Sequence, residues 1–259
     1  MGYEMVGGRI VTWALEAHVV DHCNLQCAQC CTLSPWLPAR FVAPDQLEHD
    51  LTAASRVLSP AVFKLTGGEP SLHPNLVECI EAARASRISP VLSMTTNGLL
   101  ATQLPDRVFQ LLDRITLSVY ASSPLPTRTL AHIESRCQAY DVRLTVKPIG
   151  VFQEITPASP GDEEQARRVY ASCWLRVRCH TIHRGRFYPC TRPPHVASVL
   201  DRRGIDPGPW DGDGVELAGE EGTTRRAVIA LLRRTDPLAS CRWCLGSTGG
   251  WMAHRQAKR

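Results

Sequence analysis

The sequence has no long apolar run. None of its 259 residues lies in an uninterrupted apolar stretch of about 20 residues, the length that a membrane-spanning helix needs. Its first residues also lack the charged start and the apolar core of a secretion signal. We therefore expect a cytoplasmic protein with no membrane partner.

Long basic runs are absent as well. The chain has 29 Lys and Arg residues against 25 Asp and Glu residues, a net charge of +4, and no basic stripe interleaved with its few aromatic residues. Nucleic-acid-binding proteins usually carry such a stripe, so we expect no nucleic-acid partner. The length and the 44% hydrophobic content fit one main domain with a small appendage.

Cysteine, in contrast, is abundant, with 11 residues. Without a secretion signal, so many thiols indicate metal ligands in a reducing compartment, not a disulfide framework. Cys23, Cys27 and Cys30 follow the spacing C-x3-C-x2-C. Three thiolates so spaced can hold three corners of a four-iron cluster and leave one iron open. A structural zinc loop with the adjacent Cys31 as fourth ligand is the alternative.

The first 150 or so residues alternate between strand and helix patterns. Runs of β-branched and apolar residues predict strands at 10–20, 61–65, 91–95, 115–120 and 142–146. Apolar residues at helical spacing predict helices at 44–58, 75–85, 105–112 and 127–140. This alternation predicts an α/β fold with a parallel sheet, closed into a partial (β/α)6 TIM-like barrel. Functional residues then belong at the carboxyl ends of the strands.

Two short motifs follow predicted strands. Gly67-Gly68-Glu69-Pro70 comes after the second strand and Thr95-Thr96-Asn97-Gly98 after the third. Glycines let the backbone approach a ligand closely, with carbonyls able to accept hydrogen bonds from an ammonium group. With the cysteine spacing, these motifs resemble those of the radical S-adenosylmethionine (radical SAM) superfamily.

The resemblance implies a [4Fe-4S] cluster with one open iron and SAM bound to that iron. In this superfamily, reductive cleavage of SAM yields a 5′-deoxyadenosyl radical. The implied cluster ligands are Cys23, Cys27 and Cys30. The implied SAM contacts are Gly67, Gly68, Glu69, Pro70, Thr96, Asn97, Ser118 and Lys147, the last pairing with the SAM carboxylate. Where family members usually have an aromatic residue before the third cysteine, this chain has Gln29, so we expect adenine to pack on Trp36 or Leu33.

A second group of cysteines follows a connector at residues 156–161. Here the sequence predicts a helix at 162–171, then a hairpin at 180–189 that turns at Arg184-Gly185. The spacing Cys173-x11-Gly185-x4-Cys190, followed after a gap by Cys241-x2-Cys244, resembles the twitch region. The twitch region is a shortened SPASM extension that holds one auxiliary [4Fe-4S] cluster. The predicted domains are therefore a radical SAM core at 1–155 and, at 156–259, the completion of the barrel with a small α+β extension, a hairpin plus a helix, that binds the cluster.

Five cysteines compete for the four places in that extension. They are Cys173, Cys179, Cys190, Cys241 and Cys244. Cys173 fits the spacing better and Cys179 fits the hairpin geometry better, so both remain candidates. A zinc ribbon also combines a hairpin with a C-x2-C knuckle, and zinc is the alternative metal.

The remaining candidates are single residues. We expect Cys79 and Cys137 to be core residues and Cys31 to be a catalytic hydrogen-atom donor. The segment 193–222 is rich in Pro, Gly and Asp, and the tail 254–259 is expected to be solvated. Candidates to line the cavity are Tyr120, Arg192 and Glu216. The histidines His22, His180, His183 and His195 form no i, i+4 pair, so they predict no second metal site.

The expected function is hydrogen abstraction from a small polar substrate such as a sugar, cyclitol or nucleoside. A short chain with one auxiliary cluster resembles the 2-deoxy-scyllo-inosamine dehydrogenases of aminoglycoside assembly, which implies a two-electron oxidation in natural product biosynthesis. The expected partner is an electron donor such as flavodoxin or ferredoxin. Radical epimerases, decarboxylases and peptide-modifying enzymes are the enzymatic alternatives. A non-catalytic iron-sulfur or zinc module is the alternative from another class.

Overall fold

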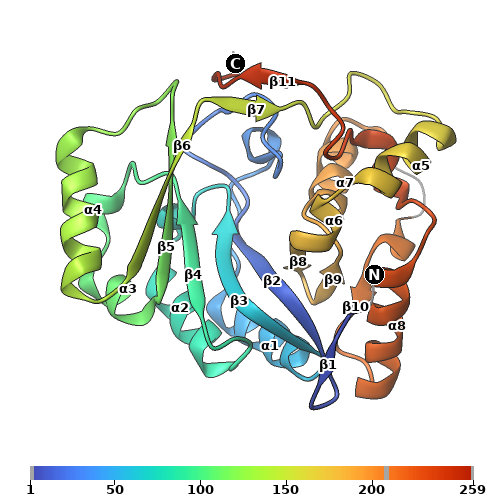
Figure 1. The fold of residues 1–259 in the computed structure, drawn as a ribbon, viewed down its shortest axis with the longest axis horizontal. Helices are drawn as coiled ribbons and strands as arrows, with labels where there is room; N and C mark the ends of the chain where they lie inside the picture. The colour runs from blue at the N-terminus through green and yellow to red at the C-terminus, as the bar shows by residue number, and fades with distance from the viewer. Residues whose placement is uncertain (1–2, 207–209, 258–259) are drawn as a thin grey trace.

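The computed structural model describes residues 3–206 and 210–257. Within them, nine strands form one sheet in the order β10-β9-β8-β2-β3-β4-β5-β6, with β1 beside β2 (Figure 1). Their bounds are β1 Met5–Val6, β2 Arg9–Val20, β3 Leu58–Gly67, β4 Leu92–Thr96, β5 Arg114–Tyr120, β6 Arg143–Ile149, β8 His180–His183, β9 Arg186–Tyr188 and β10 Val215–Glu216. A separate antiparallel pair joins β7 (Val151–Gln153) to β11 (Trp251–Ala253).

The helices divide into two groups along this sheet. The first group connects the parallel strands and covers one face of the sheet: α1 Pro44–Ser55, α2 Leu76–Ala85, α3 Asp106–Leu111 and α4 Thr127–Ala139. The second group gathers near β8, β9 and β10 (Figure 1): α5 Glu163–Ser172, α6 Leu175–Arg178, α7 Arg192–Arg202 and α8 Glu221–Arg233. The mixed α/β fold with a parallel sheet predicted from the alternating pattern is confirmed, with shifted ends; β3, for example, begins at Leu58.

The sixth parallel strand, β8, lies on a side of the sheet that sequence order does not suggest. The strands β2 to β6 pair in chain order, and β8 pairs in parallel with β2, on the far side from β6. The sheet therefore remains open at β6. The hairpin that contains β8 turns at Arg184 and Gly185, whose φ angles are 50° and 72°, as the sequence predicts.

Helix α7 was not predicted. Its sequence begins Arg192-Pro193-Pro194 inside a segment rich in turn formers. Proline is nevertheless tolerated in the first turn of a helix, where backbone N–H groups have no helical partner. The rest of the predicted Pro-, Gly- and Asp-rich segment includes residues 207–209, which lie outside the described part of the chain.

The core lies between the sheet and the first group of helices. Fully buried residues such as Leu15, Phe63 and Leu92 point from the strands toward this layer. Cys79 and Cys137 belong to the same cluster, as predicted for core cysteines. In the described residues, no helix is both long and apolar enough to cross a membrane.

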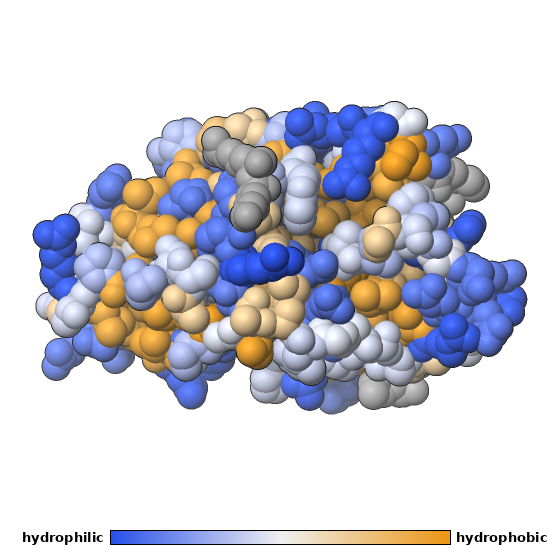
Figure 2. Space-filling view, turned by 90° about the horizontal axis from the view of Figure 1, so that it is seen from above, coloured by the Kyte–Doolittle hydropathy of each residue, from blue (hydrophilic) through white to orange (hydrophobic). Residues whose placement is uncertain are grey.

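The surface seen from above is mixed in polarity, and hydrophilic residues gather at its right-hand end, over α5 (Figure 2). On that helix Arg167 and Arg168 pair with Glu163 and Glu164 at i, i+4 spacing. Such exposed pairs contribute little to stability, so this end of the molecule is a solvated face.

Candidate functional site

The cysteine loop leaves β2 after Val20 and is held by the glycine motif. The N–H of Gly68 donates to the Val20 carbonyl at 2.8 Å, and the N–H of Glu69 donates to the His22 carbonyl at 3.1 Å. A Cβ on Gly68 would lie 1.9 Å from the His22 oxygen, and one on Gly67, where φ is +142°, would lie 2.2 Å from the Val20 oxygen. Only glycine allows the two backbones to come this close.

The buried carboxylate of Glu69 ties this motif to the end of β4. Its Oε1 accepts hydrogen bonds from the Ser71 N–H (3.0 Å), the Ser71 hydroxyl (2.7 Å) and the Thr96 hydroxyl (2.6 Å). Its Oε2 accepts one from the Asn97 N–H at 2.7 Å. Burial raises the pKa of Glu69, and these donors oppose the rise. Four donors thus make Glu69 a structural clamp as well as a cavity residue.

Asn97 connects the same strand end to the cysteine loop. Its side-chain N–H group donates to Asn24 Oδ1 at 2.7 Å and lies 3.7 Å from the sulfur of Cys23. Its Oδ1 accepts from the Leu99 N–H at 3.0 Å, which fixes the rotamer. The three sequence motifs therefore meet in one hydrogen-bonded network.

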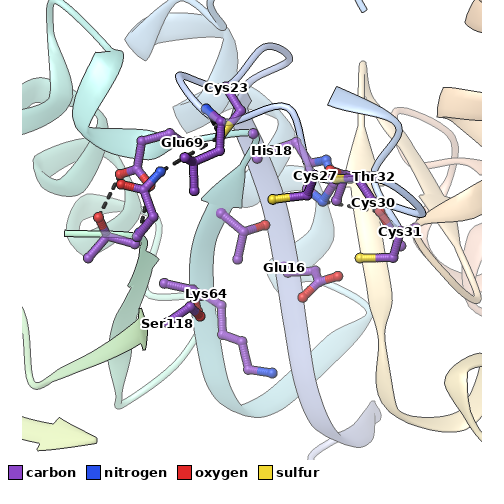
Figure 3. Close-up of a pocket in the computed structure, with 18 of the residues that line it drawn as sticks. Glu16, His18, Cys23, Cys27, Cys30, Cys31, Thr32, Lys64, Glu69 and Ser118 are labelled. Carbon is purple, nitrogen blue, oxygen red and sulfur yellow. Dashed lines mark hydrogen bonds between the residues drawn. The ribbon is translucent and has the colours of Figure 1, made fainter. Parts of the chain in front are cut away.

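One cavity of about 260 Å³ lies beneath this network. Its upper wall contains the three spaced cysteines together with Gly67, Gly68, Glu69 and Asn97, as Figure 3 shows for the labelled residues Cys23, Cys27, Cys30 and Glu69. Thr96 and Ser118 line it as well. The structure thus brings together most of the residues that the sequence implied for a cluster and for SAM.

The three thiols suit a metal cluster. In the described residues no disulfide joins them, and all three face the same cavity. Burial raises the pKa of Cys23 and of Cys27 to about 12, and neighbouring thiols add to the rise. Thiols of this kind bind a metal only by releasing their protons, so metal and proton compete for them.

Two charged residues deeper in the cavity were missed in the sequence. Glu16 on β2 and Lys64 on β3 are register partners and point into the cavity below the cysteines (Figure 3). Glu16 accepts a long hydrogen bond, 3.4 Å, from the Thr181 hydroxyl, and its burial raises its pKa, while Lys64 and Thr181 oppose the rise. In the described residues, Lys64 forms no ion pair or hydrogen bond. The only sequence signal was a charged residue inside each apolar strand.

Two further thiols face this cavity. Cys31, the predicted hydrogen-atom donor, lines it next to Cys30 and is exposed to solvent. Cys179 lines the same cavity, and burial raises its pKa to about 12.

The other four cysteines of the second group meet elsewhere. A separate small cavity is lined by Cys173, Cys190, Cys241 and Cys244. The backbone N–H of Gly246 donates to the sulfur of Cys244 at 3.1 Å. Of the two competing candidates, the structure places Cys173 with this set and Cys179 in the first cavity. Four thiols around one small cavity are the ligand set of a four-iron cluster. Among the described residues, no three His, Cys, Asp or Glu side chains are placed to hold a single metal ion.

The expected adenine contacts are wrong. Leu33 and Trp36 pack against α7 in a separate apolar cluster and do not line the cavity. Gln29 has a structural role instead: its Oε1 accepts hydrogen bonds from the backbone N–H groups of residues 155 and 156, at 2.9 and 2.8 Å. The aromatic residues that line the cavity are Tyr120, which was predicted, and Phe152.

The C-terminal tail was expected to be solvated, and over residues 254–257 this is wrong. The Ala28 N–H donates to the Arg255 carbonyl at 2.9 Å, and the Gln26 N–H donates to Gln256 Oε1 at 2.6 Å. The ring of His254 stacks on Tyr120 with centroids 4.7 Å apart. The tail therefore covers one side of the cysteine loop. Residues 258 and 259 lie outside the described part of the chain.

The remaining predicted residues lie around these sites. Pro70 starts a short buried turn after Glu69, and Lys147 is exposed beside Ser118, its register partner, outside the residues that line the cavity. The prediction that Glu216 lines the cavity is wrong, because this residue is exposed on β10 and pairs with Arg186 at 3.6 Å.

Arg192 lines the second cavity. Three histidines pack together: the rings of His18 and His183 each contact that of His195.

Comparison with known proteins gives the class. Residues 18–146 match the family model described as the radical SAM superfamily. The matched range begins in β2, ends in β6 and includes the cysteine loop and both glycine-containing motifs. The chain therefore contains a radical SAM domain.

Named relatives match part of the chain. It is 33% identical over 117 residues to the GTP 3′,8-cyclase of Microcystis aeruginosa, which is 42% of this chain and 35% of that protein. It is 30% identical over 167 residues to the GTP 3′,8-cyclase of Streptomyces coelicolor, 60% and 48% of the two chains. The matched region thus spans about a third to a half of these relatives.

A solved structure resembles nearly the whole chain. BtrN in complex with AdoMet and 2-DOIA aligns with a TM-score of 0.51 over 90% of this chain and 92% of that one. The sequence identity is 13%, so this likeness establishes the fold.

Proposed function

We propose that this protein is a radical SAM dehydrogenase that oxidises a small polar substrate. The observation that supports it most is the meeting of three free thiols, the glycine motif and Asn97 around one cavity. Cys23, Cys27 and Cys30 would hold the catalytic [4Fe-4S] cluster. The backbone of Gly67 and Gly68, with Thr96, Asn97 and Ser118, would bind SAM. When bound, these cofactors supply the 5′-deoxyadenosyl radical that abstracts a substrate hydrogen atom.

Two charged residues of the chain would then act on the substrate, one as a proton acceptor and one as a hydrogen-bond donor. Oxidation of a carbinol carbon to a carbonyl requires loss of the hydroxyl proton, and Glu16 is the carboxylate placed in the cavity to accept it. The ammonium of Lys64, which forms no ion pair or hydrogen bond among the described residues, would donate a hydrogen bond to a neighbouring substrate oxygen. Tyr120 and Phe152 would give the substrate and adenine an apolar wall.

A two-electron oxidation also needs an acceptor for the second electron. Cys173, Cys190, Cys241 and Cys244 would hold it as an auxiliary [4Fe-4S] cluster. In this proposal residues 1–155 form the radical SAM core and residues 156–259 contribute β8 and the auxiliary site. The physiological reductant would be a flavodoxin or ferredoxin, and no nucleic acid takes part.

The charge of the cavity argues against a nucleoside triphosphate such as the GTP named in the curated relatives. Among the described residues that line it, the charged ones are Glu16, Lys64 and Glu69, and no arginine is present. A triphosphate is bound by several cations, and bound thiolates would make the cavity more negative. A neutral or cationic sugar or cyclitol fits this balance better.

A redox-neutral epimerase is the second candidate. It is favoured by one observation, the thiol of Cys31 in the same cavity. A thiol S–H bond can return a hydrogen atom to a substrate radical, and the resulting thiyl radical would then need reduction. The product would keep the oxidation level of the substrate and take its new hydrogen from solvent.

The experiment removes the proposed electron acceptor. Parent protein, purified anaerobically, should contain about eight iron and eight sulfide per chain, as two four-iron clusters require. We expect the Cys241→Ala/Cys244→Ala variant to keep about half of each, to cleave SAM and to transfer deuterium from labelled substrate into 5′-deoxyadenosine, with little oxidised product. Zinc in the second cavity, or solvent deuterium in an unoxidised product, would contradict the dehydrogenase.

A further inference from the structure

Arg192 is a buried cation without an anionic partner in the described part of the chain. Its side chain is at the first turn of α7, and the residue is 2% exposed. Its two terminal nitrogens donate to the Cys31 carbonyl (3.2 Å), the Thr156 hydroxyl (3.1 Å) and the Trp243 carbonyl (3.3 Å). All three acceptors are neutral, and the buried Nε has no hydrogen-bond partner.

Burying the charge of Arg192 without a counter-ion is energetically unfavourable in the folded protein. An arginine remains charged at any pH that a folded protein meets, and a buried charge normally has a counter-ion. Leaving it uncompensated strongly destabilises a fold. The position of Arg192 therefore indicates that a negative charge belongs close to it.

The second cavity is where that charge would lie. Arg192 lines it together with Cys173, Cys190, Cys241 and Cys244. A four-iron cluster held by four thiolates is a net anion, and its negative charge grows when it is reduced.

We propose that Arg192 is the built-in counter-charge of an anionic iron-sulfur cluster in the second cavity and raises the reduction potential of that cluster. This inference rests on the proposed auxiliary cluster. The guanidinium also bonds the carbonyl of Cys31, which follows the first cluster loop, and the carbonyl of Trp243, which precedes Cys244. Arg192 thereby joins the two metal-binding loops and sets their spacing.

The sign of the effect follows from electrostatics. A cation in a buried, low-dielectric site stabilises the more negative, reduced cluster more than the oxidised one. Removing that cation must lower the reduction potential. Lysine keeps the charge but not the planar fork that reaches three acceptors, so it should preserve part of the effect.

The test is an electron paramagnetic resonance redox titration. It uses the Cys23→Ala/Cys27→Ala/Cys30→Ala protein, in which only the second cluster can titrate. Three substitutions are introduced separately into this protein: Arg192→Met, Arg192→Lys and, as a control, Arg176→Met. Arg176 lines the same cavity, but it is only partly buried, and its guanidinium lies over the Tyr170 ring at 4.3 Å. Iron and sulfide are measured in every sample.

We expect the midpoint potential to become clearly more negative in Arg192→Met, and to shift less in Arg192→Lys and in Arg176→Met, because the charge of the partly buried Arg176 is screened by solvent. An unchanged midpoint in a fully loaded Arg192→Met protein would overturn the inference. If Arg192→Met fails to load, Arg192→Gln is titrated in its place. Loss of iron from both neutral variants but not from Arg192→Lys supports the counter-charge, and loss from all three contradicts it. A parent without iron in this cavity would instead refute the auxiliary cluster itself, which the iron analysis reports separately.

Discussion

At the scale of single residues, the carboxylate of Glu16 is the group in the first cavity best placed to take a proton from a substrate hydroxyl. It must be ionised to do so. Because burial raises its pKa, the ionised form is lost at a higher pH than for a glutamate in water. Activity should therefore fall on the acid side at a pH above the ordinary value of about 4.3 for glutamate.

Replacing Glu16 tests this role. We expect Glu16→Gln to lower the rate of substrate oxidation at least about 100-fold, the usual contribution of a general base, and to abolish the acid limb. Formation of 5′-deoxyadenosine should continue, because among the described residues the side chain of Glu16 hydrogen-bonds Thr181 and none of the three cluster cysteines. The exposed Glu48→Gln on α1 is the matched control. Parent-like oxidation rates in Glu16→Gln would show that another group accepts the proton.

Replacing Lys64 gives a second test of the role of Glu16, through the pKa of its carboxyl group. Its ammonium lowers the pKa of Glu16, in opposition to burial. The variant Lys64→Met removes that effect, so the pKa of Glu16 should rise and the acid limb of the pH–rate profile should move to higher pH. A limb that stays in place, or that moves to lower pH, would mean that Glu16 is not the titrating group.

The sequence predicts those residues of the first cavity whose spacing along the chain is itself characteristic of the site. The three spaced cysteines and Gly67-Gly68 have fixed separations because one loop and one turn must present them. Glu16 and Lys64 have no such local constraint. They meet because two strands pair in register, and a single sequence does not reveal that register.

At the scale of elements, the glycine motif at the end of β3 packs directly against the backbone of the loop after β2. A side chain at Gly68 would collide with backbone atoms, the His22 oxygen at 1.9 Å and the Cys23 nitrogen at 2.8 Å. Backbone cannot move aside as a flexible side chain can, so the cysteine loop itself must shift.

Gly68→Ala should therefore reduce both stability and cluster loading. Overpacking of this kind costs about 1–3 kcal/mol, and we expect Tm to fall by several degrees. Iron at the first site should fall more than iron at the second. The control is Gly150→Ala, where an added Cβ meets no atom within 4 Å. Equal iron content and equal Tm in the two variants would contradict the described contact.

The elements themselves were predictable to different degrees. Strict alternation of strand and helix patterns led to the parallel sheet, because few topologies accommodate it. The pairing of β8 with β2 was not predictable, since it joins segments far apart in the chain. Helix α7 was missed because its prolines resemble a loop unless their place in the first turn is known.

At the scale of the whole molecule, the C-terminal end of the described chain meets the cysteine loop at the site. The tail at 254–257 forms backbone hydrogen bonds with residues 26–28, and Gln256 contacts the sulfur of Cys27 at 3.9 Å. A contact between residues about 230 positions apart depends on the entire fold. This explains why the sequence alone suggested a solvated tail.

Removing residues 254–259 should expose one side of the first cluster. We expect the truncated protein to lose iron from the first site several-fold faster on exposure to air, with little change at the second site. The absorbance of the two clusters, followed in parent and cysteine-variant proteins, measures this. A truncation of residues 258 and 259 alone is the control. Identical decay in both truncations would show that the tail gives no protection.

The central claim is that Cys23, Cys27 and Cys30 support reductive cleavage of SAM. The most direct measurement is 5′-deoxyadenosine formed from SAM and dithionite by anaerobically reconstituted protein. We predict its formation by the parent and its absence in Cys23→Ala/Cys27→Ala/Cys30→Ala, which should still hold about four iron atoms at the second site. Formation of 5′-deoxyadenosine by that triple variant, or none by a fully loaded parent, would contradict the account.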